Sequence, residues 1–358
     1  MGLFGLGKVK TFLGVDIGTA GAKLVQLKEE GGRAKLHTYA FFDRTLKETG
    51  ESLLDMQDFG VAALKEMIKK SKCTATRAIA SLPISSVFMS VLSVPRMNEK
   101  DQRGAIEVQA RKIIPIPLEE MILDVKNITS PDEEKKPKDE KSKYIKVLLT
   151  AAPKKLVAKY MAMLKGAGFE VASIEPEAFS LVRSLVGKDK STLMIIDIGA
   201  LRTSVMVVSE GIPYLTRSID VGGIKFTKAA AASLGVSEEE AEMMKADLRA
   251  DASLAPGSIA KVFEAPAMQI VNEILFSLKL FSGLEEAKGK TIDKIILTGG
   301  GSLLPNLDAF ISAKVNLRVF RGDPWARILY PDAARPALDE IGSRFSVAVG
   351  LAMREFEQ

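Results

Sequence analysis

The chain has 358 residues, 47% of them hydrophobic, so it can bury more than one sizeable core and we expect two or more domains. The net charge is +5, but the basic residues are scattered and only 6% of residues are aromatic, which argues against a nucleic-acid groove with stacking platforms. The single cysteine, Cys73, excludes an internal disulfide, and the single histidine, His37, argues against a histidine-based metal site or catalytic triad.

The N-terminal residues carry no pattern of a membrane segment or a targeting signal. No uninterrupted apolar run reaches the ~18 residues of a membrane-spanning helix, so we expect a soluble chain. Lys8 and Lys10 interrupt the apolar start and a predicted strand follows at once, so no removable signal peptide is expected. Leu6 stands where a myristoylation motif requires Ser or Thr.

The first structured stretch is typical of a β-hairpin and covers residues 12–27, FLGVDIGTAGAKLVQL. Apolar residues lead to Asp16, Gly18 opens a tight turn two residues later, and a second apolar run leads away. The pattern predicts strands around 11–18, 22–29 and 33–42, then a helix at 57–70 and a short buried strand at 77–81.

From residue 84 to about 173 the pattern changes, which indicates an inserted segment. A helix is predicted to begin after Asn98, with Ile106, Ala110 and Ile113 as its apolar stripe, and to end near Ile113 because Pro115 follows. Further elements are predicted as strands at 85–94, 121–128 and 144–152 and a helix around 156–164. Residues 131–143 lack apolar side chains and are predicted to be a mobile hairpin loop.

Residues 169–187 return the chain to the first domain by a strand and a helix. Glu175 and Glu177 stand at their junction, where a carboxylate could orient an attacking water. Each could also be a helix-start charge favoured by the macrodipole, and the local sequence alone favours this second reading.

The hairpin pattern returns at residues 193–208, LMIIDIGALRTSVMVV, with Asp197 and Gly199 in the places of Asp16 and Gly18. Turns of this kind expose successive backbone N–H groups that bind anions, and a carboxylate at a strand end can hold a hydrated Mg²⁺. Two copies suggest two half-domains that face one nucleotide phosphate chain with its metal. Hydroxyls of Thr19 and Thr203 and the ammonium of Lys23 could contact the phosphates. A single copy would read as an ordinary hairpin turn, and the repetition favours the phosphate site.

Downstream, Gly222 and Gly223 are predicted to open a helix, and a second helix at 237–248 begins with a capping box of Ser237 and Glu240. Glu242 and Lys245 lie one helical turn apart and could contact a ribose or base, or form a plain surface ion pair. A long buried helix is predicted at 265–281. A strand, three glycines and a helix then follow within 294–311, and the glycines would allow a base or phosphate close to the backbone, or merely make a turn.

The order of these motifs, DIGT, EPEAF, DIGALRT, VGG, EEEAEMMK, LTGGG and AVGLAM, resembles that of the actin, heat-shock chaperone and sugar kinase ATPases. Within that superfamily the chain resembles the PilM family of cytoplasmic actin-like type IV pilus assembly proteins and, more distantly, the division protein FtsA. The PilM resemblance rests on residues 93–124, SVPRMNEKDQRGAIEVQARKIIPIPLEEMILD, and on TRSIDVGGIKFTKAAA.

The resemblance implies an α/β fold of the actin-like (ribonuclease H-like) class, in which duplicated domains surround a nucleotide cleft and a small α+β subdomain is inserted in the first. The first domain would comprise 1–83, completed by 174–188 and 338–358, with the inserted subdomain at 84–173. The second domain would comprise 189–225, completed by 266–337, with a helical subdomain at 226–265.

The resemblance also implies a site for ATP or ADP with Mg²⁺. The first phosphate clamp would be Asp16, Gly18, Thr19 and Lys23, and the second Asp197, Gly199 and Thr203. Glu242 and Lys245 would meet the ribose and adenine, with Gly299, Gly300 and Gly301 behind the nucleotide. Asp16 and Asp197 would hold the Mg²⁺ through water, and Glu177 would position the attacking water.

Three positions depart from the family pattern. Pro176 precedes the candidate glutamate where the family places a proline after it, and Leu201-Arg202 stand where small or hydroxyl residues are usual. Gln109 replaces a usual glutamate in the inserted helix. Nucleotide binding tolerates these changes better than efficient hydrolysis, so at most a slow ATPase is expected.

The resemblance implies an ATP-binding scaffold of the type IV pilus inner-membrane assembly platform, which binds the cytoplasmic N-terminal tail of a PilN-like membrane protein in a nucleotide-sensitive way. The surface between the first domain and the inserted subdomain would receive that tail. The protein would be cytoplasmic and held at the inner membrane through its partner, since the sequence stops at GLAMREFEQ (350–358) where an FtsA-like protein would carry an amphipathic anchor. Other pilus proteins and self-association are expected as further contacts. The alternatives are an FtsA-like polymerising protein tethered at the membrane and a small-molecule kinase, for which no sugar-binding phrase is found.

Overall fold

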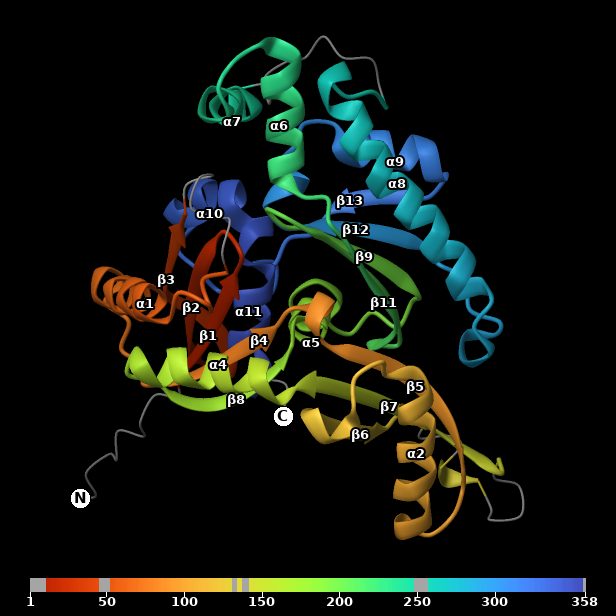
Figure 1. The fold of residues 1–358 in the computed structure, drawn as a ribbon. Helices are drawn as coiled ribbons and strands as arrows, with labels where there is room; N and C mark the ends of the chain where they lie inside the picture. Colours follow the sequence, from red (N-terminus) through yellow and green to blue (C-terminus); the bar gives the residue numbers. More distant parts are fainter. Residues whose placement is uncertain (1–10, 45–51, 131–133, 137–141, 248–256, 357–358) are drawn as a thin grey trace, which may run out of the picture. The chain divides into compact units, whose positions relative to one another are not determined.

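The computed structural model describes residues 11–44, 52–130, 134–136, 142–247 and 257–356. The chain divides into two compact units (Figure 1). Unit 1 comprises Met1–Ser81, Lys159–Gly187 and Gly322–Gln358, and unit 2 comprises Leu82–Ala158 and Lys188–Arg321. The predictions for residues 1–10 and for most of the loop at 131–143 lie outside the described residues.

Unit 1 contains a five-stranded sheet of order β3-β2-β1-β4-β8. Its strands are β1 (Thr11–Gly18), β2 (Gly21–Glu30), β3 (Arg33–Asp43), β4 (Arg77–Leu82) and β8 (Glu170–Pro176). Its helices are α1 (Gln57–Ser71), α5 (Glu177–Leu181), α10 (Arg335–Ile341) and α11 (Ser346–Ala352), and α4 (Lys154–Gly166) enters it after Ala158. The strand predictions for 11–42 and 77–81 and the helix prediction for 57–70 are confirmed.

The core of unit 1 forms because alternating apolar residues of β2 face α11 and a loop that contains the only tryptophan. Val25 and Leu27 are fully buried together with Trp325 and Phe345. The indole of Trp325 donates a hydrogen bond to the carbonyl oxygen of Leu338 at 3.1 Å, which satisfies its buried N–H. Residues 322–337, which the sequence-based division gave to the second domain, therefore belong to unit 1.

Unit 2 contains a second five-stranded sheet, of order β11-β10-β9-β12-β13, and a three-stranded sheet of order β5-β7-β6. The strands of the first are β9 (Leu193–Ile198), β10 (Thr203–Ser209), β11 (Ile212–Ile219), β12 (Lys294–Thr298) and β13 (Arg318–Arg321). The strands of the second are β5 (Phe88–Pro95), β6 (Met121–Asn127) and β7 (Tyr144–Pro153). The helices are α2 (Glu99–Ile113), α6 (Gly223–Leu234), α7 (Glu238–Asp247), α8 (Lys261–Ser282) and α9 (Leu307–Val315).

The two five-stranded sheets share one topology. In unit 1, β1 pairs antiparallel with β2 and parallel with β4, and in unit 2, β9 pairs antiparallel with β10 and parallel with β12. The hairpin repeat seen in the sequence is therefore a repeat of the sheet itself. The four-subdomain division remains a prediction.

Three sequence predictions in unit 2 need correction. The strand expected from 85 begins at Phe88, because Ile84–Ser86 form a 3₁₀ turn. The helix expected from 265 begins at Lys261, since Phe263 is buried in the core and draws the preceding turn into the helix, and its outer face exposes Leu275 and Phe276. On α2, Ile113 is 37% exposed and the following Ile114 takes the buried place.

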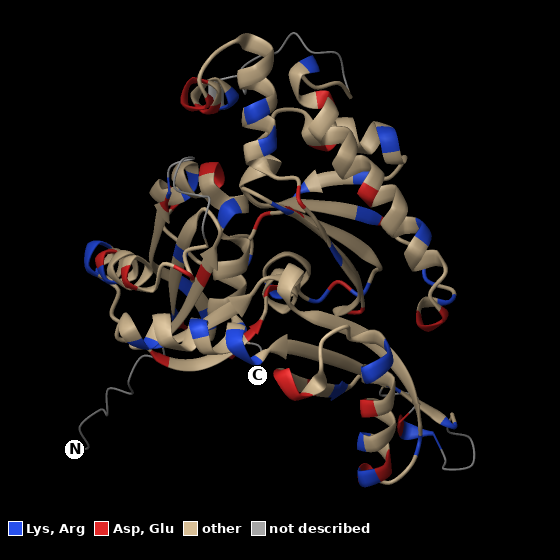
Figure 2. Ribbon diagram, in the orientation of Figure 1, with Lys and Arg blue, Asp and Glu red and all other residues tan. Residues whose placement is uncertain are grey.

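Charged residues are distributed over both units. Lys and Arg lie among Asp and Glu along the helices and loops (Figure 2). Within the described residues, no helix combines the length and the apolar character needed to cross a membrane.

Candidate functional site

The first hairpin places Asp16 and Lys23 opposite one another on β1 and β2. Their Cα atoms are register partners, and Nζ of Lys23 lies 3.3 Å from Oδ2 of Asp16. Asp16 is 9% exposed, whereas Thr19 in the turn is exposed. Gly21 closes the turn with φ +149°, and a Cβ there would overlap the carbonyl oxygen of Phe42. Packing against β3 thus requires a glycine at the end of this turn.

Gly18 has a different environment from Gly21. A Cβ added to Gly18 would have Gly21 O at 3.6 Å and Nζ of Lys23 at 3.9 Å as its nearest neighbours, which is ordinary contact. The fold of unit 1 therefore does not itself require glycine at this position.

The two glutamates at the β8–α5 junction have different surroundings. Glu175 is 8% exposed and pairs with Arg183, while Nε of Arg354 lies 3.6 Å from its Oε2. Its carboxylate is therefore part of a buried ion cluster that joins β8 to the C-terminal elements. Glu177 is the first residue of α5. Burial raises the pKa of the Tyr160 phenol, and the negative charges of Asp16 and Glu177 raise it further. Both carboxylates therefore interact electrostatically with the same side chain of unit 1.

The second hairpin places Asp197 beside the glycine triplet that follows β12. Thr298 is the register partner of Asp197, so Gly299 lies next to that carboxylate. Gly299 has φ +80°, and a Cβ there would lie well under 3.0 Å from Oδ1 of Asp197 and from the carbonyl oxygen of Ile198. A glycine at this position is therefore required for Asp197 to keep its place.

The turn of the second hairpin is hydrogen-bonded to the start of α6. The backbone N–H of Gly199 closes the turn on the Arg202 carbonyl at 2.8 Å, and the N–H of Gly223 donates to the Gly199 carbonyl at 2.9 Å. Thr203 is fully buried, and its hydroxyl donates to the Val221 carbonyl at 2.6 Å. In this structure Thr203 holds β10 to the segment before α6, and its hydroxyl does not face an open space.

Glu242 and Lys245 of α7 join the start of α6 in one polar network. Nζ of Lys245 donates to Glu242 at 2.7 Å, to the hydroxyl of Thr227 at 2.9 Å and to the carbonyl of Gly223 at 3.2 Å. The Thr227 hydroxyl is hydrogen-bonded to Glu242 as well. The sequence analysis missed Thr227, and its place one helical turn after Gly223 was the available signal.

Unit 2 therefore brings together most of the residues predicted for its half of the site. Asp197 lies beside Gly299, the Gly199 turn contacts Gly223, and Gly223 accepts from Lys245. Such a set of a carboxylate, an ammonium group and side-chain-free backbone can receive a polar ligand that carries phosphate. In unit 1 the corresponding set is Asp16, Lys23 and the turn that follows Gly18.

The positions that depart from the family pattern have partners of their own. Arg202 pairs with Asp220, with 3.0 Å between the guanidinium and the carboxylate. The amide of Gln109 donates to the Ser93 carbonyl at 3.2 Å, which fastens α2 to β5.

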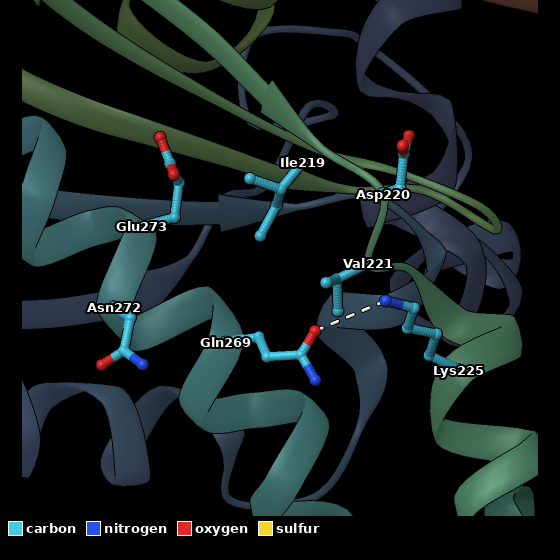
Figure 3. Close-up of a pocket in the computed structure, with 7 residues that line it drawn as sticks. All are labelled: Ile219, Asp220, Val221, Lys225, Gln269, Asn272 and Glu273. Carbon is cyan, nitrogen blue, oxygen red and sulfur yellow. Dashed lines mark hydrogen bonds between the residues drawn. The ribbon is translucent and has the colours of Figure 1, made fainter.

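A groove of about 370 Å³ lies elsewhere in unit 2, between the end of β11, α6 and α8 (Figure 3). It is lined by Ile219, Asp220, Val221, Lys225, Gln269, Asn272 and Glu273. Lys225 donates to the amide oxygen of Gln269 at 3.4 Å, and Glu273 pairs with Arg217. None of the predicted site residues lines this groove.

In the part of the chain that the structure describes, no group of three or more His, Cys, Asp and Glu side chains could hold a metal ion without other ligands. A Mg²⁺ that arrives with phosphate groups has a smaller requirement, because one or two carboxylates and several waters complete its shell. The lone carboxylate of each hairpin, Asp16 and Asp197, fits that second case.

Comparisons with known proteins identify the family and the fold. The family model described as type IV pilus assembly protein PilM matches residues 14–356. Cell division protein FtsA of Bacillus subtilis (strain 168) is 25% identical over 225 residues, which are 56% of this chain and 51% of FtsA. The chain thus spans about half the length of this curated relative.

Two solved structures show the fold. The PilM-PilN type IV pilus biogenesis complex has a TM-score of 0.80 and 24% identity, and the match covers 97% of this chain and 99% of that chain. MreB 5 of Spiroplasma citri bound to AMPPNP has a TM-score of 0.50 and 14% identity, with 95% and 94% covered. The α/β fold predicted from the sequence is therefore confirmed as actin-like.

Proposed function

Because the chain belongs to the family of type IV pilus assembly proteins called PilM, we propose that it is a nucleotide-binding actin-like scaffold of the pilus inner-membrane assembly platform. The observation that carries the proposal is the family match across residues 14–356. The protein works at the cytoplasmic face of the bacterial inner membrane, to which a membrane partner attaches it.

The nucleotide of this proposal is ATP or ADP with Mg²⁺. A bound nucleotide supplies phosphate oxygens that accept hydrogen bonds and carry the metal. In unit 1, Asp16 would hold the Mg²⁺ through water and Lys23 would place its charge near the terminal phosphate, and in unit 2 Asp197 would be the corresponding metal-holding carboxylate. The turns that follow Gly18 and Gly199 would donate backbone N–H groups to the phosphates, while the N–H of Gly199 itself stays bonded to the Arg202 carbonyl. MreB 5, which shares the fold, has been solved with AMPPNP, a nucleotide of this kind.

The adenosine part is received by unit 2. Glu242 and Lys245 contact the ribose and base, and the Gly299–Gly301 backbone lies behind them. The existing Lys245 bonds to Glu242 and Gly223 support this assignment, because they hold both side chains in place before any ligand arrives. Thr203 takes a supporting role, since its hydroxyl is bonded to Val221.

Hydrolysis, where it occurs, depends on Glu177. Its charge and that of Asp16 both raise the pKa of Tyr160, which supports the assignment of Glu177 to the first phosphate hairpin. Glu175 is unsuited to orienting water, because its charge is neutralised by two arginines. We expect slow turnover at most.

The partner is the cytoplasmic N-terminal tail of a PilN-like membrane protein, bound in a nucleotide-sensitive way. The structural match to the PilM-PilN complex covers 97% of this chain, which supports a partner of this kind. The inserted subdomain exposes Val108, Ile122 and Val125, at 56%, 45% and 41%, and exposed apolar side chains of this kind suit a peptide partner.

The test uses isothermal calorimetry with Mg-ATP and with a synthetic N-terminal PilN-like peptide. Asp16→Asn and Asp197→Asn are each expected to lower the affinity for Mg-ATP at least about tenfold, which corresponds to about 1.4 kcal/mol of binding free energy. Asp332→Asn is the matched control, because its fully exposed carboxylate lies outside the site. Unchanged affinity in both site variants would exclude the nucleotide assignment, and absence of peptide binding with and without ATP would exclude the partner.

An FtsA-like polymerising function is the second candidate, and the FtsA match supports it. Sedimentation with Mg-ATP separates the two functions. Pelleting of the protein without a partner favours the polymerising function. A heat of peptide binding in calorimetry, without pelleting, favours the scaffold function.

A further inference from the structure

Tyr160 connects α4 to the turn of the first hairpin. Its side chain is 1% exposed, and its hydroxyl donates to the carbonyl oxygen of Ile17 at 3.3 Å. Ile17 directly precedes Gly18, at the start of the proposed phosphate turn. All three residues belong to unit 1.

The Ile17 carbonyl lies beyond the last residue of β1 that pairs with β4. The parallel pairing of these strands ends at Val15 and Ala80, while Ile17 is still the register partner of Ala22 on β2. A buried carbonyl without a partner strand on one side needs a donor from another element. The phenol of Tyr160 supplies one.

The helix that carries Tyr160 is itself firmly held within unit 1. Met163 and Leu164 are fully buried, and the terminal atoms of Met163 fill the space beside Gly60 of α1. The amide of Gln57 donates to the Lys159 carbonyl at 3.2 Å. The donor on the Ile17 carbonyl is therefore attached to a packed helix and not to a loop.

We propose that Tyr160 is a positioning residue for the nucleotide, whose hydroxyl holds the Ile17–Gly21 turn in the shape that receives the phosphates. The inference rests on the proposed function and deepens it, since the first phosphate turn depends on α4, the helix by which the chain leaves the inserted subdomain. Tyr160 itself does not touch the ligand. Its contribution is to keep the turn ordered before the nucleotide arrives.

The experiment compares Tyr160→Phe with Tyr39→Phe. The first removes only the hydroxyl at the turn and keeps the ring, and the second makes the same chemical change on β3, where the Tyr39 ring packs on Phe345. Deuterium uptake over residues 13–24 is measured by mass spectrometry without nucleotide. Mg-ATP affinity is measured by calorimetry well below the melting temperature of each variant.

Tyr160→Phe is expected to exchange severalfold faster over 13–24, with other peptides of unit 1 unchanged, and to bind Mg-ATP about tenfold more weakly, which corresponds to about 1.4 kcal/mol. Tyr39→Phe should change neither quantity. Uptake over 13–24 equal to that of the wild type overturns the inference, and so does an unchanged affinity where the wild type binds. A wild type that binds no nucleotide refutes the proposed function instead, and the exchange result still decides whether Tyr160 holds the turn.

Discussion

Replacement of Gly299 by alanine tests the contact that keeps Asp197 in place. Gly299 has φ +80° and ψ 165°, a region that only glycine adopts readily. The added Cβ would also overlap the Asp197 carboxylate and the Ile198 carbonyl. The variant thus meets two separate penalties, one from the backbone conformation and one from the collision.

The structure offers a control that has a positive φ without the collision. Gly289 also has φ +80°, but nothing lies within 4 Å of the Cβ it would gain. Backbone strain alone should cost about 1–2 kcal/mol in Gly289→Ala. The collision should add about 1–3 kcal/mol in Gly299→Ala, which brings its total to about 2–5 kcal/mol.

Urea unfolding followed by far-ultraviolet circular dichroism measures the difference in stability between the two variants. Tryptophan fluorescence is not suitable, because Trp325, the only tryptophan, lies in unit 1 and both glycines lie in unit 2. Gly299→Ala should unfold at clearly lower urea and lose Mg-ATP affinity, since Asp197 must move away from the new methyl group. Gly289→Ala should keep its affinity. Equal destabilisation of the two variants would show that the collision is relieved at no cost and would refute the reasoning.

Three further results are expected. A cycle of Lys245→Met and Glu242→Gln should give a coupling of about 0.5–1 kcal/mol in urea unfolding, a modest value because Glu242 is nearly half exposed. Glu175→Gln should cost about 3 kcal/mol or more by leaving buried arginine charge uncompensated, whereas Glu177→Gln should change stability by less than about 1 kcal/mol and lower any ATP turnover. A lysine hydrogen bond, with help from a serine, lowers the pKa of Asp189 to about 2, so its charged form stabilises the fold above the unfolded pKa of about 4. The melting temperature of Asp189→Asn should accordingly lie below that of the wild type at pH 7, and the gap should narrow as the pH falls from about 4 toward 2.

Each of these expectations has an outcome that contradicts it. Additive effects of the two α7 substitutions would mean that their network has no energetic coupling. Equal stability losses for the two glutamine variants would remove the distinction between a structural and a functional glutamate. A melting-temperature gap for Asp189→Asn that persists unchanged at pH 2 would show that its charge is not the cause.

Local features of the fold were predictable because they depend on residues close in sequence. Apolar runs on both sides of Asp16 and Asp197, each with a glycine two residues after the Asp, identified both hairpins. The capping box at Ser237 is present, with the Ser237 hydroxyl accepting from the Glu240 N–H at 3.2 Å. Asn98 likewise caps α2 by accepting from the N–H of Asp101 at 3.0 Å. Hydrogen bonds between residues three positions apart form in any context that permits a helix.

Boundaries that depend on burial were less predictable. Helix α8 starts four residues before the expected position because Phe263 packs against Phe226, with ring centroids 6.0 Å apart. Nothing in the local sequence around Lys261 signals that contact. Residues 322–337 lie in unit 1 for the same reason, since Trp325 joins a core whose other members come from distant parts of the chain.

The sequence by itself determined the two hairpins, the order of the motifs and the family, because periodicity and short motifs are properties of neighbouring residues. Only the tertiary structure decided which of the candidate groups are free to act. It showed Thr203 bonded to Val221, Glu175 bound to arginines and Tyr160 in contact with Ile17 across 143 positions. Such contacts form because separate elements pack together, and the free energy of that packing is not written in any one segment.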